Sequence, residues 1–269
     1  MEYEPLKKRI AAFFRNHPVL RPVLFRILDV VLLRAWHVKK ALRSIGLDRD
    51  KPLAILDAGA GFGQVAESLI RRFPKAVVTA VDIDPEHVED GNLYFVAKAP
   101  GRVKFLCQDL VGFEAPEPFD LVVSVDVLEH IDDDRTVVRR FAECLKPGGH
   151  VLVTTPSLYR RSSRDGAFVA EHFREGYSDS SMRHLFGEAG FDSIRIRYAY
   201  GFWGDLSWKL GIRTAMGLAG KGVWGKVAAV LVFGAVSPLV FALMALDFVW
   251  PNRRGTGIVL VARKPEIRT

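Results

Sequence analysis

The sequence predicts an α/β fold in which a largely parallel sheet carries helices on both faces. Residues 53–56 are all apolar, which suits a strand that is buried on both faces and therefore need not alternate. Glycines follow at positions 59, 61 and 63, and apolar residues then recur at helical spacing from Gln64 onward. A second strand, residues 76–83, comes next. The chain thus has the strand–turn–helix–strand order of a nucleotide-binding unit.

The turn after the first strand contains a D-x-G-x-G-x-G pattern that starts at Asp57. A dinucleotide site would require G-x-G-x-x-G, but the sixth position counted from Gly59 is Gln64. The pattern resembles motif I of class I S-adenosylmethionine (SAM) methyltransferases. That resemblance implies a Rossmann-like sheet of seven strands with helices on both faces. It also implies a SAM site that includes Asp57, Gly59, Gly61, Gly63 and Gln64, with an acid near the ammonium group of the cofactor.

Length and composition restrict the possible partners. The 269 residues suffice for one large domain, or for one domain with elaborations. The mean hydropathy of +0.11 is high for a purely soluble enzyme. A net charge of +7 favours an anionic partner, such as a membrane surface, a nucleic acid or an acidic substrate. Cys107 and Cys144 form neither a disulfide framework nor a zinc pattern, so we expect a reducing cytosol and no metal. Residues 1–9 lack the features of a signal peptide.

The first 50 residues are strongly basic, with eleven Lys and Arg against five acids. Apolar residues between Leu24 and Leu42 recur at helical spacing, cations surround that stripe, and Pro22 suits the first turn of a helix. A basic amphipathic helix of this kind predicts contact with a membrane interface. The alternative is a helix that caps the sheet and shows a solvated basic face.

The second strand ends at Asp82, which lies 23 residues beyond Gly59. An acid near this offset binds ribose hydroxyls, because each carboxylate oxygen accepts one hydroxyl proton. We expect Ile83 to pack against the face of the adenine. Asp84 is followed by a proline and predicts the start of the next helix.

Later strands are expected at residues 103–106, within 119–130 and at 151–155, in the order that the family shows. After the third strand, the resemblance implies that Asp109 accepts from the adenine amino group. It implies also that the amide of Leu110 contacts a ring nitrogen. Ser124 and Asp126, near the end of the fourth strand, complete the implied SAM site, and S-adenosylhomocysteine is the implied product.

Candidate proton-handling residues follow the fourth strand, because ligands bind at the carboxyl ends of parallel strands. Histidine titrates near neutral pH, so His130 is a candidate base for a phenol or an activated hydroxyl. Alternatively, His130 orients the loop by hydrogen bonding. Glu129 and Asp126 are candidates to hold the methionine ammonium directly or through water, and Glu129 is also a candidate substrate-binding residue.

A second group, residues 171–178, resembles the His-x-Arg-x-x-Tyr-Ser region of many lipid- and quinone-type methyltransferases. The resemblance implies that His172 and Tyr177 line the acceptor pocket as catalytic candidates. It implies also that Arg174 binds an anionic head group. The alternative makes Ser178 a helix N-cap and leaves His172 on the surface.

About 55 residues separate the sixth and seventh expected strands, 191–200 and 257–261, far more than an ordinary loop. These two strands form an antiparallel pair in the family. Residues 227–246 carry no charge and would span a bilayer as one helix. A single span would separate the paired strands. We therefore expect a hairpin that breaks near Gly234 or Ser237–Pro238 and dips into one leaflet. A soluble lid or a dimer contact is the alternative.

The sequence predicts three parts. Residues 1–50 form a basic helical region, residues 51–200 and 256–265 the SAM-binding domain, and residues 201–255 a membrane-docking helical insertion. The predicted enzyme methylates a hydrophobic, membrane-resident acceptor such as a lipid, a phenolic lipid or a quinone-type molecule, preferably on oxygen. It acts at the cytoplasmic side of the membrane as a peripheral or monotopic protein that binds anionic lipids.

Two alternatives stay open at this point. One is a methyltransferase of a soluble metabolite or sugar, and the other is a non-catalytic SAM-binding assembly subunit. A nucleic-acid substrate is not expected, because the base-modifying signature Asn/Asp-Pro-Pro-Tyr/Phe is absent after the fourth strand. The acceptor, the methylated atom and a possible homodimer are left open.

Overall fold

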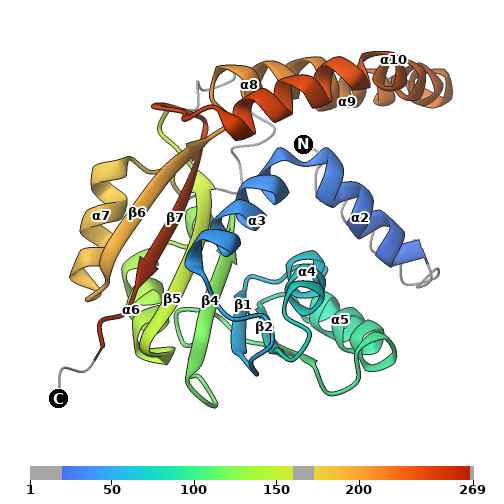
Figure 1. Cartoon of the computed structure of the whole chain (residues 1–269). Coiled ribbons are helices and arrows are strands. Elements are labelled where there is room, and N and C mark those ends of the chain that lie inside the picture. The colour runs from blue at the N-terminus through green and yellow to red at the C-terminus, as the bar shows by residue number, and fades with distance from the viewer. Residues whose placement is uncertain (1–19, 160–172, 267–269) are drawn as a thin grey trace.

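The computed structural model describes residues 20–159 and 173–266, and it contains a seven-stranded sheet (Figure 1). The strand order is β3-β2-β1-β4-β5-β7-β6, and β7 runs antiparallel to both of its neighbours. The predicted Rossmann-like α/β sheet of seven strands is confirmed. Its strands are β1 (Ala54–Ala58), β2 (Val77–Asp82), β3 (Val103–Cys107), β4 (Phe119–Val125), β5 (Leu145–Pro156), β6 (Asp192–Ala199) and β7 (Gly257–Arg263).

Helices cover both faces of the sheet. One face carries α3 (Leu33–Ile45), α4 (Gln64–Arg72) and α5 (Pro85–Lys98), and the opposite face carries α6 (Asp134–Cys144) and α7 (Asp179–Glu188). Successive residues of β1 divide between the two cores because side chains alternate along a strand. Ile55 joins the first core and Leu56 the second, and both are fully buried.

Local sequence signals set the helix starts. The carboxylate of Asp84 accepts from the N–H of Glu86 at 2.8 Å and caps α5, and Pro85 occupies its first turn. Ser178 caps α7 and exchanges hydrogen bonds with Ser181 in a capping box. Both predicted helix starts are confirmed.

The N-terminal helix α2 (Arg21–Val31) is attached to the domain through a buried arginine. The guanidinium of Arg21 pairs with Asp90 at 2.9 Å and donates to the carbonyl of Phe62 at 2.6 Å. It also lies 4.4 Å from the centroid of the Tyr94 ring. The first part of the basic stretch therefore packs against the domain, and α2 and α3 meet at Leu32 instead of forming one long helix.

The side of α2 that faces away from the domain is apolar. Its buried residues, Arg21, Phe25 and Asp29, recur every four positions and define the packed side. Large apolar side chains that are 45–54% exposed occupy the opposite side: Leu20, Val23, Ile27 and Val30. The charged residues Arg21 and Asp29 are thus on the packed side of α2, whereas the sequence predicted an apolar packed stripe surrounded by cations.

The 201–255 insertion is a helical hairpin whose two arms lie side by side and extend away from the sheet (Figure 1). The first arm comprises α8 (Phe202–Trp208), the π-helical segment η3 (Lys209–Arg213) and α9 (Thr214–Ala219), and the second arm is α10 (Gly222–Val249). The predicted break at Gly234 or Ser237–Pro238 is wrong. The chain reverses before α10, and Gly222 adopts φ +82°, a conformation that suits glycine.

A local hydrogen bond lets α10 continue through its proline. Pro238 lacks the N–H that would bond to the carbonyl of Gly234 one turn earlier. The hydroxyl of Ser237 donates to that carbonyl at 2.9 Å and replaces the missing donor. The Ser-Pro pair therefore preserves the helix that it was expected to interrupt.

Candidate active site

The carboxyl ends of the parallel strands bring the glycine turn and several acids to one edge of the sheet. A Cβ at Gly59 would lie 2.3 Å from the side chain of Val127, so the close approach of the turn to the segment after β4 requires glycine. The N–H of Gly61 donates to Asp82 Oδ2 at 2.7 Å. This bond holds the turn after β1 against the end of β2.

Asp82 is held in a defined orientation by several donors. Besides Gly61, the N–H of Asp84 donates to Oδ1 at 3.0 Å, and His87 Nδ1 lies 3.4 Å from the same oxygen. Burial opposes ionisation, but the bonds from His87, Asp84 and Gly61 outweigh it and lower the pKa of Asp82. Asp82 is therefore a carboxylate at neutral pH, as the acceptor of two diol protons must be.

Asp57 is a buried acid in β1 that lacks a full set of partners. It is 1% exposed, and its Oδ2 makes no hydrogen bond to any of the residues described. Burial raises the pKa of Asp57 to about 7. The hydrogen bond from the Ala66 backbone opposes this rise, and the negative charge of Asp82 adds to it. An unpaired buried polar atom costs about 1–3 kcal/mol, so a cationic donor placed here would be stabilised and would ionise Asp57.

Three further predicted residues lie beside Asp82. Ile83 follows it directly and is 70% exposed, which leaves an apolar surface at this edge. Asp82 is paired with Cys107 in the register of β2 and β3, so the residues after β3 reach the same edge. There Asp109 Oδ1 accepts from the N–H of Val111 at 3.0 Å, while Leu110 is buried.

A basic side chain from α3 enters the site. The guanidinium of Arg34 forms an ion pair with Asp126 directly after β4. Asp126 Oδ1 also accepts from Thr154 Oγ1 at 2.7 Å, and its backbone has a φ of +54°. A residue other than glycine in this left-handed backbone conformation stores about 1–3 kcal/mol of strain, and such residues cluster at functional sites. Ser124 is fully buried, and its hydroxyl makes no hydrogen bond within the described ranges.

Glu129 and His130 lie in the short 3-10 turn η2 (Leu128–His130) after β4. Glu129 is 1% exposed, and its Oε2 accepts from Thr155 Oγ1 at 3.1 Å. Burial and the charge of Asp126 raise the pKa of Glu129 to about 8, so this carboxyl is largely protonated at pH 7. His130 is half-buried, and both side chains are at the edge where they were predicted.

Tyr177 and Arg174 hold the loop after β4. The hydroxyl of Tyr177 lies 2.7 Å from Asp134 Oδ2 and 3.2 Å from the carbonyl of Leu128. Arg174 Nη1 pairs with the same Asp134 oxygen at 3.0 Å, and Nη2 donates to a carbonyl of this loop at 2.6 Å. Tyr177 and Arg174 thus stabilise this loop, which differs from the acceptor-binding roles predicted for them. His172 lies outside the described residues.

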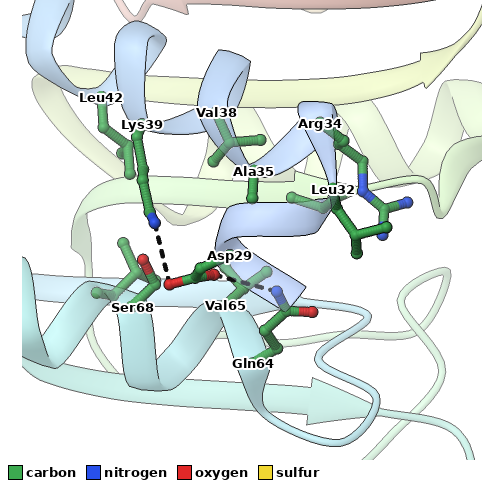
Figure 2. Close-up of a pocket in the computed structure, with 12 residues that line it drawn as sticks. Asp29, Leu32, Arg34, Ala35, Val38, Lys39, Leu42, Gln64, Val65 and Ser68 are labelled. Atoms are coloured by element: carbon green, nitrogen blue, oxygen red, sulfur yellow. Dashed lines mark hydrogen bonds and ion pairs between the residues drawn. The ribbon is translucent and has the colours of Figure 1, made fainter. Parts of the chain in front are cut away.

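A pocket lies between α2, α3 and the start of α4 (Figure 2). Asp29 of α2 pairs with Lys39 Nζ at 3.0 Å and accepts from Gln64 Nε2 at 3.1 Å. Gln64 thereby connects the glycine turn to α2, and Arg34 lines the same pocket. Sequence reasoning missed Asp29 and Arg34. Helical spacing places both on a helix but cannot show which strand end that helix crosses.

A model of the methyltransferase domain family matches residues 33–196, from the start of α3 into β6. The chain belongs to the class I SAM-dependent methyltransferases. The match includes the glycine turn, Asp82 and the loop after β4, and it ends before the hairpin of α8–α10. The predicted family is confirmed.

This methyltransferase is similar to curated proteins over less than half of its length. Ubiquinone biosynthesis O-methyltransferase of Xylella fastidiosa is 33% identical over 125 residues, which are 44% of this chain and 49% of that protein. An uncharacterised methyltransferase of Mycobacterium tuberculosis is 41% identical over 119 residues, 42% of this chain and 58% of the other. The chain thus spans about half the length of the curated relatives it matches.

Solved structures share the methyltransferase fold. Haemonchus contortus phosphoethanolamine N-methyltransferase 2, solved with S-adenosyl-L-methionine, has a TM-score of 0.63 at 20% identity and covers 86% of this chain and 52% of its own. The cyclase SpnF has a TM-score of 0.52 at 21% identity, and the match covers 81% of this chain and 76% of the SpnF chain. At these identities the likeness shows the fold alone.

Proposed function

We propose that this methyltransferase transfers the methyl group of SAM to a hydrophobic acceptor at the cytoplasmic face of a membrane, with oxygen as the preferred acceptor atom. The observation that carries the proposal is the exposed side of α10, which is apolar along the helix. The C-terminal end of α10, at Val249, leads back to the edge of the sheet where β6 ends and β7 begins. The similarity to ubiquinone biosynthesis O-methyltransferase supports an acceptor of this chemical class.

The glycine turn and the ends of β2 and β3 fit SAM. The Asp82 carboxylate would hold the ribose diol, exposed Ile83 would cover the adenine, and Asp57 would face the ammonium group. The unpaired Asp57 oxygen is the main support, because a buried carboxyl with a free acceptor fits a cationic ligand. The other residues assigned to the cofactor are Gly59, Gly61, Gly63, Gln64, Asp109, Leu110, Ser124 and Asp126.

The residues after β4 are placed to manage a proton. When bound, SAM supplies a methyl group that its sulfonium already activates, so the protein must align the acceptor, exclude water and handle a proton. An oxygen acceptor is a better nucleophile when a base takes its proton. His130 is the candidate base, and protonated Glu129 is able to donate a hydrogen bond that positions the acceptor oxygen.

The exposed side of α10 supports docking to a membrane. No charged residue lies between Lys226 and Asp247, and within the described ranges α10 is the helix long and apolar enough to cross a bilayer. Only 22% of the most apolar stretch of α10 is buried. A continuous apolar surface of this kind marks an interaction site. Its exposed large side chains are Val223, Trp224, Val227, Val230, Leu231, Leu239, Leu246, Val249 and Trp250.

Sheet pairing favours a monotopic arrangement over a simple span. Ala199 at the end of β6 pairs with Gly257 at the start of β7, so both ends of the insertion are at the same edge of the sheet. A hairpin that lies in the plane of one leaflet, with the exposed side of α10 in the acyl layer, satisfies this constraint and keeps its turn at the level of the head groups. The exposed cations Arg213, Lys221 and Lys226 near the turn suit anionic head groups.

Incubation of the purified full chain with radiolabelled SAM tests the proposal. A fractionated membrane-lipid extract and a pool of water-soluble metabolites are offered in separate reactions. We expect label in a lipid fraction, and none with an Asp82→Ala variant. Label only in the soluble pool would assign a metabolite acceptor. SAM binding without label in either pool would make the protein a non-catalytic SAM-binding subunit.

A further inference from the structure

A shallow apolar groove lies at the base of the hairpin, between the start of α3, the first hairpin arm and α10. Its walls combine residues that are far apart in the chain, among them Leu33, Trp208, Ile212, Val240 and Met244. Leu33, Val240 and Met244 are buried, and they form a core cluster separate from the two that cover the sheet. Ligand sites are mostly apolar surfaces with a few polar groups. The groove has this character, with Tyr200 and Ser207 as its polar members.

One wall of the groove has an irregular helix. The segment η3 (Lys209–Arg213) is π-helical and carries Ile212 into the groove. A π-turn leaves backbone groups less well paired, and here the hydroxyl of Thr214 donates to the Lys209 carbonyl at 2.8 Å. Single π-turns are rare and occur frequently at functional sites. The irregularity is thus a second observation that points to a ligand at this position.

The groove is connected to the active site through two consecutive residues. Leu33 lines the groove, and Arg34, the next residue, pairs with Asp126 after β4. The N–H of Arg34 also donates to the hydroxyl of Tyr200, another groove residue, at 3.0 Å. Asp126 and Tyr200 both have a φ of +54°. Two strained residues therefore flank Arg34 where the groove meets the edge that carries Glu129 and His130.

We propose that this groove binds the apolar chain of the methyl acceptor, so that the head group reaches the edge formed by Asp126 and Glu129. The inference rests on the proposed function, because it assumes that the acceptor is hydrophobic. Continuity with the active site selects the acceptor chain over a membrane acyl chain. A membrane chain would lie along the outer side of α10, where no such connection exists among the described residues.

Tryptophan quenching tests the site without any turnover. Bromine atoms on an alkyl chain quench tryptophan on contact, and Trp208 lines the groove. The exposed Trp224 and Trp250 are first replaced by phenylalanine, so that no tryptophan fluorescence arises from the outer side of α10. A dibrominated C18 fatty acid is then added below its micelle-forming concentration. We expect saturable quenching that a further Trp208→Phe substitution largely removes.

A matched pair of variants locates the binding. Ile212→Gln places an amide in the groove, whereas Leu231→Gln places the same amide on the outer side of α10, where Leu231 is 68% exposed. We expect Ile212→Gln to weaken probe binding about tenfold or more, the effect of an amide without partners in an apolar site. Leu231→Gln should leave it unchanged. SAM affinity should be equal in both variants, which establishes that both are folded.

Several results would overturn the proposal. Absence of Trp208 quenching in the protein that carries only the Trp224→Phe and Trp250→Phe replacements would do so regardless of whether Ile212→Gln folds. Equal losses in the two variants would place the probe on the outer side of α10. Quenching by vesicles of dibrominated phosphatidylcholine but not by the free acid would assign the groove to the membrane itself.

The proposed function is tested separately by the radiolabelled lipid extract. If the parent protein labels lipid and Ile212→Gln does so at the same rate, the groove is not the acceptor site although the function stands. If Trp208 is quenched but no lipid is labelled, the groove binds an apolar chain and the proposed function fails.

Discussion

His37 Nε2 lies 3.1 Å from Asp247 Oδ2, although 210 positions separate the two residues in the chain. Asp247 is fully buried and also accepts from the N–H groups of Tyr200 and Gly204 at 3.2 and 3.1 Å. Asn252 Nδ2 donates to it at 3.1 Å. One carboxylate therefore attaches the base of the hairpin to α3 and to the end of β6.

Replacement of Asp247 by alanine should destabilise the protein strongly. The change leaves several buried donors without an acceptor, and we expect a loss of roughly 2–4 kcal/mol in the free energy of unfolding. Urea denaturation measures this loss. The control is Asp205→Ala, which removes an exposed pair with Lys209 and should cost less than about 0.5 kcal/mol. Similar losses in both variants would show that Asp247 does not anchor the hairpin.

Asp82→Asn should weaken SAM binding by about tenfold to a hundredfold, because hydrogen bonds to a charged acceptor are worth roughly 1.5–3 kcal/mol. The carboxamide retains the shape but can accept through only one oxygen. Titration calorimetry measures the affinity. Asp84→Ala is the control, since it removes the cap of α5 and lowers stability by about 1 kcal/mol while the Asp82 carboxylate is retained. An unchanged affinity in Asp82→Asn would remove Asp82 from the ribose site.

Asp57 should make SAM binding depend on pH. Its pKa is about 7 in the ligand-free protein, and a cation beside Oδ2 favours the carboxylate. Binding should therefore release a proton near pH 7, and affinity should fall by up to about tenfold per pH unit below about 7. Calorimetry in buffers of different ionisation enthalpy detects this proton. Asp57→Asn should abolish the release, and release that persists in that variant would assign it to another group.

The same raised pKa has a consequence for stability in the absence of SAM. The folded state binds the Asp57 proton more tightly than the unfolded state, whose ordinary value is 3.8. This contribution to stability is complete below pH 3.8 and is lost as the pH rises through about 7. The difference in unfolding free energy between the parent and Asp57→Asn should follow that window. A pH-independent difference would contradict the shift.

Tyr177→Phe distinguishes the two roles considered for this residue. If the hydroxyl only holds the loop through Asp134, the variant should lose about 1 kcal/mol of stability. Its turnover at saturating acceptor should remain within about twofold, because no transition-state contact is removed. Denaturation and initial-rate measurements provide the two values. A large fall in kcat with stability unchanged would restore the role in the acceptor pocket.

Polar substitutions on α10 should reduce membrane binding. Val230 and Leu231 are 72% and 68% exposed, and their joint change to serine should lower vesicle partitioning by about tenfold or more. Cosedimentation with phosphatidylcholine vesicles, with and without phosphatidylserine, measures the effect. Leu93 and Val96 on α5 are 65% and 70% exposed and provide the matched control pair. Equal partitioning of both double variants would exclude α10 as the docking surface.

Local patterns were sufficient for the elements whose determinants lie close together in sequence. The glycine turn, the caps at Asp84 and Ser178, and the acid at the end of β2 depend on backbone geometry within a few residues. These features were predicted in place. The hairpin turn was predicted at the wrong position because Ser237 repairs the hydrogen bond that Pro238 removes, and such a repair depends on side-chain geometry.

By itself, the sequence determined the family, the succession of the strands along the chain and the residues that follow each strand. All of these depend on short motifs and on the order in which the motifs occur. Only the tertiary structure decided that Arg34 meets Asp126, that Asp247 meets His37, and that the hydroxyl of Tyr177 donates to Asp134. Periodicity defines which side of a helix is apolar, but it does not name the surface against which that side packs. Contacts between distant residues are selected by the packing of the whole chain, and they are not encoded at either position alone.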